Sequence, residues 1–370
     1  MGAIFWAIGQ QINPLTVILY SLCIGNLITP PLNRLNFLFE RPFPYNWLVF
    51  LPVLLIFIPP VYVISSLIVW WIAPPSPQPL SKAITEGWRF PSLITLVFGV
   101  ITFLYNTTKD RLERRNVELQ RSVELGAVQL EMHEQELERA REIQQSLLPK
   151  DIPQLPGFEV AGAWQPARTV GGDYFDVLKL GESRLAICIA DVVGKGVSAA
   201  LLMANVQATV RAFARDSASP AWVCTKVNSV LCGNISTEKF VTFFYGVLDN
   251  DTRTLQYCNA GHPYPIIVSS GSIGQLEQGG AVLGVFPAWK YEDSSIKLNS
   301  GDRLLLFTDG ITEASGSDGL EFGEDNLAAF AKAHSASSAS ELNNRLLAQV
   351  TSFCAAQFHD DATLLVIAVD

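Results

Sequence analysis

Long apolar runs dominate the first hundred residues, whereas the rest of the chain alternates apolar and polar positions over shorter distances. A helix needs about 20 apolar residues to cross a bilayer. The run from Trp47 to Ile72 exceeds that length and contains no charge. The first run, Ile4 to Ile28, is weakened by Gln10 to Pro14, and the third, Phe90 to Tyr105, is short. We predict a transmembrane region of about three helices over residues 1–107, with a buried helical core domain as the alternative.

Basic residues at the end of the third apolar run predict its orientation. Lys109, Arg111, Arg114 and Arg115 follow this run directly, and such residues accumulate on the cytoplasmic side of a membrane. With three spans the N-terminus would lie outside the cell. If the first run does not cross, there are two spans and the N-terminus lies inside. No basic residue precedes the first run, which argues against a cleaved signal peptide.

A charged helical connector is predicted over residues 108–149. One series of positions, spaced seven residues apart, runs from Leu112 to Leu147. A second series with the same spacing, which includes Leu130, is offset from the first by four residues. Together they form an a/d seam of about five heptads, interrupted at Gly126 and at polar positions. This pattern predicts a marginal parallel coiled coil and hence a homodimer, with a single charged linker helix as the alternative.

Short β-rich runs and blocks of helical pattern fill residues 150–370, after Pro149 ends the connector. Strands are predicted over residues 159–164, 174–180, 184–190, 241–248, 254–259, 265–268, 294–298, 303–307 and 363–369. Helices are predicted over residues 198–215, 220–234, 324–332 and 340–357. Strands with helices in separate blocks indicate an α+β fold, in which helices cover antiparallel sheets.

Charge and cysteine content exclude some classes of function. The chain has 370 residues and a formal net charge of −9, which argues against a nucleic-acid partner. Its six cysteines are scattered without a CxxC pair, which is typical of reduced thiols and not of a disulfide framework or a zinc site.

Aspartates mark the ends of the most apolar predicted strands. Asp191 ends "RLAICIAD", Asp309 ends "RLLLFTD", Asp360 and Asp361 precede "ATLLVIAV", and Asp173 opens its own strand. Taken singly, each could cap a turn or a helix. If they meet, however, their carboxylates would repel one another, and divalent cations would resolve the repulsion. All-oxygen ligands suit Mg²⁺ or Mn²⁺ and not zinc.

Six segments carry a resemblance to a known family. In order, they are "LERAREIQQSLLP", "VGGDYFDV", "IADVVGKGVSAALLMA", "NAGHPYPIIV", "LLLFTDGITEA" and "HDDATLLVIAV". Together they resemble the bacterial SpoIIE/RsbU-like branch of the metal-dependent (PPM-type) protein serine/threonine phosphatases, over residues 137–370. The resemblance implies an αββα sandwich with two divalent cations, Mn²⁺ or Mg²⁺, in a cleft at one end of the sheets.

The same resemblance implies the metal ligands. They are the carboxylates of Asp173, Asp191, Asp309 and Asp360 and the main-chain carbonyl of Val192. The nucleophile would be the water between the two ions, so that no side chain serves as a catalytic nucleophile.

Four further polar residues near these motifs have weaker interpretations. For His262, the favoured interpretation is a structural loop residue, and the alternative is a proton donor. For Lys195, the favoured interpretation is a solvated loop cation, and the alternative is a phosphate contact. Arg168 is a weak candidate for phosphate binding. Asp176 follows Asp173 by three positions, so in a strand their side chains would point to opposite faces. We predict a structural role for it.

The sequence therefore predicts a multi-pass protein of the bacterial cytoplasmic membrane, bound to lipid, with its phosphatase domain in the cytoplasm. By resemblance, its substrate is a phosphorylated signalling protein such as an anti-sigma-factor antagonist. Two alternatives are a catalytically silent receptor or scaffold with the phosphatase fold, and a hydrolase of small phosphoesters.

Overall fold

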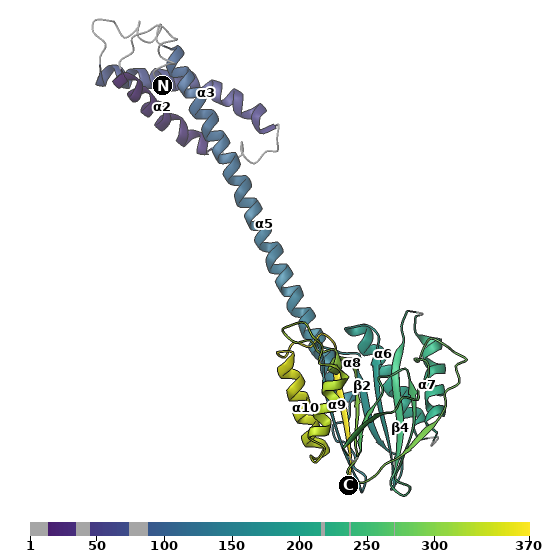
Figure 1. The fold of residues 1–370 in the computed structure, drawn as a ribbon. Coiled ribbons are helices and arrows are strands. Elements are labelled where there is room, and N and C mark those ends of the chain that lie inside the picture. The colour runs from purple at the N-terminus through teal and green to yellow at the C-terminus, as the bar shows by residue number, and fades with distance from the viewer. Residues whose placement is uncertain (1–13, 35–44, 74–87, 216–218, 237, 270) are drawn as a thin grey trace. The chain divides into compact units, whose positions relative to one another are not determined.

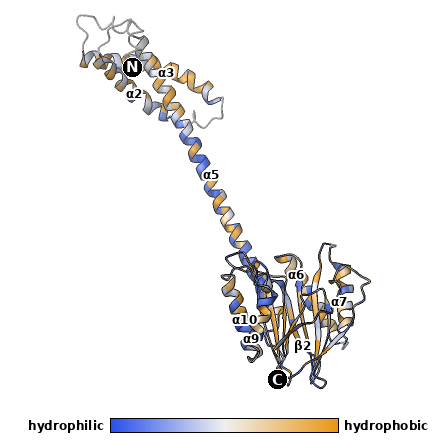
Figure 2. Ribbon diagram, in the orientation of Figure 1, coloured by the Kyte–Doolittle hydropathy of each residue, from blue (hydrophilic) through white to orange (hydrophobic). Residues whose placement is uncertain are grey.

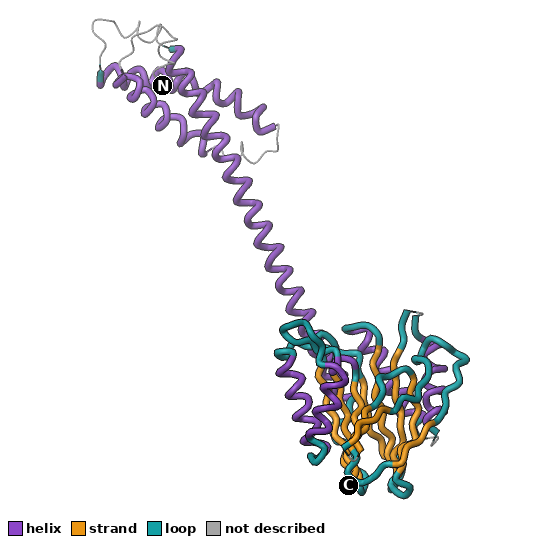
Figure 3. Tube along the Cα trace, in the orientation of Figure 1, coloured by secondary structure: helices purple, strands orange, loops and turns teal. Residues whose placement is uncertain are grey.

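The computed structural model describes residues 14–34, 45–73, 88–215, 219–236, 238–269 and 271–370. It divides the chain into two compact units, Met1–Gln129 and Leu130–Asp370. The division falls inside the predicted connector. Figure 3 separates the helices from the strands, which all lie in the second unit.

Helices form the first unit: α2 (Pro14–Arg34), α3 (Tyr45–Ile72) and the beginning of α5 (Arg89–Leu147). Their core contains Ile28 and Leu32 of α2, Phe50 of α3 and Phe103 of α5. The rings of Phe50 and Phe103 stack with their centroids 4.0 Å apart. This small core joins the three helices, while many other apolar side chains stay exposed.

One helix of the described residues, α3, is long and apolar enough to cross a membrane. The orange colour along α3 in Figure 2 reflects this apolar sequence. The third predicted span lies within α5, which does not meet the same criterion in the described part of the chain. The first predicted span lies partly outside the described residues.

The connector is continuous with the third apolar run, because α5 contains both in 59 residues. Apolar residues of the predicted seam, among them Leu112, Leu119, Val123 and Leu130, are exposed in the single chain. The helix ends at Leu147, just before Pro149.

The second unit is a sandwich of two antiparallel sheets (Figure 1). One sheet has the order β1-β10-β9-β6-β7, and the other has the order β2-β3-β4-β5-β8. The strands are β1 (Phe158–Gln165), β2 (Tyr174–Lys179), β3 (Arg184–Val192), β4 (Val241–Asp249), β5 (Thr254–Ala260), β6 (Ile266–Ser269), β7 (Ser272–Gln275), β8 (Ser294–Lys297), β9 (Arg303–Phe307) and β10 (Ala362–Val369).

Helices cover the outer face of each sheet. The helices α6 (Val197–Phe213) and α7 (Pro220–Asn234) lie on the β2–β8 sheet, and α9 (Gly323–Ala333) and α10 (Ala339–Phe353) lie on the β1–β7 sheet. The resulting αββα order confirms the predicted α+β fold.

Continuous apolar runs in the sequence match strands that are buried on both faces. In β9, Leu304 and Leu306 belong to the core between the sheets, whereas Leu305 and Phe307 pack under the outer helices. Successive side chains of a strand point to opposite faces, so a strand between two apolar layers exposes neither face to water. Polar residues are therefore favoured where such a strand ends, and a buried one inside a strand requires a partner.

Two short elements were not predicted. The strand β7 is exposed and short and has no apolar alternation, and α8 (Asp309–Thr312) is a single turn. The backbone pairing of β7 with β6 defines this strand, and a pattern of side chains does not reveal it.

Candidate active site

The predicted acids come to one end of the sandwich, where strands of both sheets end. Asp191 is the penultimate residue of β3, and Asp173 directly precedes β2 in the same sheet. Asp309 begins α8 directly after β9, and Asp360 precedes β10 in the other sheet. Burial, followed by repulsion from Asp309 and Asp360, raises the pKa of Asp191 to about 7. The fold thus places acids that are distant in sequence within electrostatic reach of one another.

Asp173 is the most deeply buried of these acids, and two threonines hold its carboxylate. The hydroxyls of Thr308 and Thr363 both donate to Oδ2 of Asp173, at 2.7 and 2.6 Å. Burial and then repulsion from Asp191 raise the pKa of Asp173 well above its ordinary value, although the hydroxyl groups oppose this shift. Burial and the neighbouring carboxylate therefore favour the neutral form of Asp173 when no cation is bound.

Asp360 differs from the other acids because it has a basic partner. The ammonium group of Lys195 lies 2.9 Å from Oδ2 of Asp360 and also donates to the carbonyl of His359 at 2.7 Å. Both side chains of the ion pair are partly exposed. The predicted loop cation therefore lies against a predicted metal ligand.

Asp361 holds the loop that carries Asp173. Its carboxylate accepts hydrogen bonds from the main-chain amides of Ala167 and Gly172, across the two sheets. A side chain at Gly171 would collide with this carboxylate, and one at Gly310 would collide with the main chain of Asp361. The absence of side chains at these two glycines allows the close approach. Asp361 thus holds the loop that carries Asp173, a contact that the sequence did not predict.

Val192 and Gly172 are also in close contact. A Cβ atom at Gly172 would lie 2.8 Å from the carbonyl oxygen of Val192. The absence of a side chain therefore lets the backbone before Asp173 approach the end of β3.

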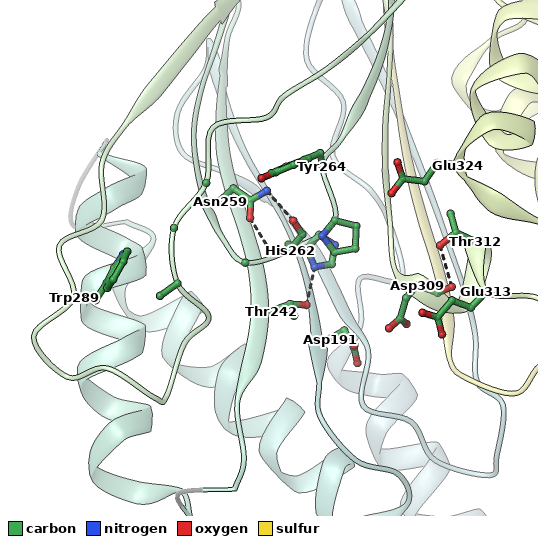
Figure 4. Close-up of a pocket in the computed structure, with 15 residues that line it drawn as sticks. Asp191, Thr242, Asn259, His262, Tyr264, Trp289, Asp309, Thr312, Glu313 and Glu324 are labelled. Atoms are coloured by element: carbon green, nitrogen blue, oxygen red, sulfur yellow. Dashed lines mark hydrogen bonds between the residues drawn. The ribbon is translucent and has the colours of Figure 1, made fainter.

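A cavity of about 770 Å³ opens beside these acids. Asp191 and Asp309 line it together with His262, Tyr264 and Trp289. In Figure 4, Thr312, Glu313 and Glu324 line the side opposite Trp289, with Asp191 between them. The cavity is therefore acidic on one side and aromatic on the other.

Comparison with known proteins agrees with this fold. The model of the family "Stage II sporulation protein E (SpoIIE)" matches residues 181–370, half of the chain. Over 280 residues the chain is 30% identical to "Phosphoserine phosphatase RsbU" of Bacillus subtilis (strain 168), covering 75% of this chain and 82% of that protein.

The chain belongs to the SpoIIE family. It is therefore a protein serine/threonine phosphatase of the PPM type, and the resemblance found in the sequence is confirmed.

Solved structures show the same architecture as this SpoIIE-family chain. The SiaA-PP2C domain of Pseudomonas aeruginosa superposes with a TM-score of 0.58 at 21% identity, covering 65% of this chain and 98% of that domain. The RsbU and RsbW domains of Rv1364c from Mycobacterium tuberculosis give a TM-score of 0.52 at 29% identity, covering 60% of this chain and 63% of that one. The fold is that of PP2C phosphatases.

Phosphatases of the SpoIIE family use divalent metal ions, and the donor chemistry of this chain fits them. Within the described ranges, no three His, Cys, Asp or Glu side chains form a group that could hold a metal ion as they stand. Even so, the acids at this end of the sandwich offer only oxygen donors, which hard cations prefer. Burial, and then repulsion between carboxylates, raises the pKa of Asp173, Asp191 and Asp309, so a cation would be stabilised beside them.

His262 and Asp176 have structural contacts. Nδ1 of His262 lies 2.9 Å from the Thr242 hydroxyl, and Asn259 bonds the main chain of His262 at both N and O. Burial lowers the pKa of His262 to about 3, so its ring is neutral near pH 7 and does not donate a proton as an imidazolium. Asp176 pairs with Arg211 of α6, 2.7 Å from its Nε. Arg168 is exposed on the loop between β1 and β2.

Gln144, near the end of α5, is a contact that sequence reasoning missed. Its amide group donates to the carbonyl of Gly171 at 2.6 Å and accepts from the amide of Gly171 at 3.0 Å. The side chain is buried, although the heptad pattern placed it in the seam. The sequence pattern carried no signal for this contact, because the burial of Gln144 depends on the loop that packs against it. The end of the connector is therefore hydrogen-bonded to the loop that leads to Asp173.

Proposed function

We propose that this chain hydrolyses phosphoserine or phosphothreonine in a signalling protein, such as an anti-sigma-factor antagonist, with the help of two divalent cations, Mn²⁺ or Mg²⁺. The proposed ligands are the carboxylates of Asp173, Asp191, Asp309 and Asp360 and the carbonyl of Val192. When bound, such cations supply the charge that stabilises a phosphoryl group and lowers the pKa of water.

The protein's own groups prepare this site in three ways. Thr308 and Thr363 both donate to Oδ2 of Asp173 and fix the orientation of its carboxylate. Asp361 holds the loop of Asp173 in place through main-chain amides. Lys195 balances the charge of Asp360 and can turn toward a substrate phosphate, because its side chain is partly exposed.

One observation carries this proposal: several carboxylates at one end of the sandwich raise one another's pKa. Burial and then Asp360 raise the pKa of Asp309, just as Asp309 raises that of Asp191. Buried like charges destabilise a fold, so a protein that assembles them from both sheets requires a cation or protons there.

Phosphate release from a phosphoserine protein tests the proposal. The full-length chain in detergent micelles should release phosphate with Mn²⁺ and lose activity when the metal is removed by a chelator. Asp191→Ala should be inactive at every Mn²⁺ concentration. Full activity without metal, or in Asp191→Ala, would contradict the proposal.

We further propose that residues 1–107 form a multi-pass membrane region and residues 108–149 a connector to a cytoplasmic phosphatase domain, residues 150–370. The length of α3 and its exposed apolar side chains support contact with lipid. Protease digestion of sealed inside-out vesicles should remove the phosphatase domain, and digestion of intact spheroplasts should not. Protection in the vesicles would exclude this orientation.

We also propose a parallel homodimer through the connector. The exposed apolar residues of the seam support it, because a lone helix gains nothing from such a stripe. In membranes, Leu130→Cys should form an intermolecular disulfide with mild oxidant. Gln135→Cys, on the opposite side of the helix, is the matched control. Equal cross-linking of both variants would mean that the seam is not the interface.

A further inference from the structure

An exposed aromatic residue of the cavity lining, Trp289, packs beside a second exposed aromatic residue, Phe286. Phe286 and Trp289 lie between β7 and β8, and their side chains are 51% and 42% exposed. Their ring centroids are 6.0 Å apart. We call this pair the aromatic shelf. Aromatic residues at this exposure are enriched in protein–protein contacts.

A side chain of α7 holds the loop that carries the aromatic shelf by hydrogen bonds. Asn228 of α7 is buried, and its amide group donates to the carbonyl of Phe286 at 2.9 Å and accepts from the amide of Gly284 at 2.8 Å. The amide of Trp289 donates to the carbonyl of Phe286 at 3.1 Å. The aromatic shelf is therefore rigid before any partner binds, which reduces the entropic cost of binding.

The aromatic shelf is continuous with the catalytic cavity. Trp289 lines the same cavity as Asp191 and Asp309, and Tyr264 lines it between them (Figure 4). A Cβ atom at Gly280 would lie 3.0 Å from Nε1 of Trp289, so the glycine leaves room for the indole at the cavity wall. A chain that places its phosphate at the acids would therefore extend directly onto the aromatic shelf.

We propose that the aromatic shelf binds an apolar side chain of the protein substrate, close to the phosphoserine, and so selects among phosphoproteins. The inference rests on the proposed phosphatase function and adds a substrate preference to it. The occupant is a polypeptide, because the phosphate belongs at the acids and only a longer substrate also covers Phe286 and Trp289. Apolar contact with the two rings would strengthen binding by excluding water.

Synthetic phosphoserine peptides test this inference directly. The full-length chain in micelles with Mn²⁺ is given peptides that carry leucine at a single position within three residues of the phosphoserine, or glycine at every such position. At the favoured position, leucine should raise kcat/KM by about tenfold, the size expected for a small apolar contact. Trp289→Ala should remove this preference mainly through KM, and Trp289→Phe should restore most of it.

Two controls separate the aromatic shelf from general damage. Hydrolysis of p-nitrophenyl phosphate by Trp289→Ala measures general damage to the site, because this small substrate reaches only the acids, and the loss of the leucine preference should exceed any change in that rate. Ile273→Ala removes an apolar side chain of β7 that is 46% exposed and outside the cavity lining, and it should keep the leucine preference. Phe286→Ala provides a second variant of the shelf itself.

Three results would overturn the inference: no preference for leucine at any position, an unchanged preference in Trp289→Ala and Phe286→Ala, or an equal loss with p-nitrophenyl phosphate. Failure of the phosphatase proposal is distinguishable, because the wild-type chain would then hydrolyse neither the peptides nor p-nitrophenyl phosphate with Mn²⁺.

Discussion

Asp173 and Asp176 lie three positions apart and are both almost completely buried, yet their surroundings differ. Asp176 faces α6, where Arg211 and the hydroxyl of Tyr174 bond its carboxylate. Asp173 faces the other sheet, where its partners are two hydroxyls and further carboxylates. Among the residues that the structure describes, Asp176 has a cationic partner and Asp173 has none. This difference agrees with the structural role predicted for Asp176 and with the proposal that Asp173 is a metal ligand.

The largest expected effect concerns Asp173. Asp173→Asn should lower Mn²⁺-dependent phosphate release by at least about 100-fold, since an amide is a poorer metal ligand. The metal-free protein should change little in stability, because burial and repulsion from Asp191 already favour the neutral form of Asp173, and an asparagine oxygen can accept from both threonines. Turnover and thermal unfolding without metal measure the two effects. A large loss of stability would mean that Asp173 is structural.

Asp176→Asn should show the reverse pattern. The change removes the charge partner of Arg211 and should cost about 1–3 kcal/mol of unfolding free energy, discounted because Arg211 is partly exposed. Near 25 °C turnover per folded molecule should stay within a few-fold of wild type, about the effect of a group that does not touch the reaction. Denaturant unfolding and activity at equal folded concentration check this result. Equal loss of activity in the two variants would remove the distinction.

The pH dependence of metal binding should also distinguish Asp173 from Asp176. Repulsion and burial raise the pKa of Asp191 to about 7, so protons compete with cations below that pH. Mn²⁺ affinity should therefore rise as the pH increases toward 7, and binding at pH 6 should release protons. Titration calorimetry in buffers of different ionisation enthalpy measures this release. In Asp176→Asn the release should be unchanged, and in Asp173→Asn it should be smaller.

A smaller effect is expected at Gln144, outside the acids themselves. Gln144→Ala removes two hydrogen bonds to Gly171, each worth about 1 kcal/mol, and frees the loop before Asp173. Phosphate release should fall by about tenfold, and higher Mn²⁺ should restore part of it, as expected for a group that orients a metal ligand. Gln145→Ala, on the exposed neighbour, is the control. Equal effects of both changes would exclude a specific role for Gln144.

The sequence predicted most of the second unit because its signals are local. Apolar runs with acids at their ends located the long strands, and the motif order predicted the family. The exposed strand β7 and the single-turn helix α8 were missed, since neither buries a periodic face. In the first unit, the prediction of about three spans depended on hydropathy alone, and within the described residues only α3 meets the requirement for length and composition.

The sequence by itself determined that several acids stand where buried strands end, because a polar side chain within a strand that is covered on both faces is costly unless it is paired. Only the tertiary structure decided what each acid does. Three positions separate Asp173 from Asp176, but the sheet directs one toward Thr308 and Thr363 and the other toward Arg211. Asp360 and Asp361 are adjacent in the sequence but also have different partners. Asp360 pairs with Lys195, whereas Asp361 accepts hydrogen bonds from main-chain amides. Their partners come from distant segments, and folding alone brings those segments together.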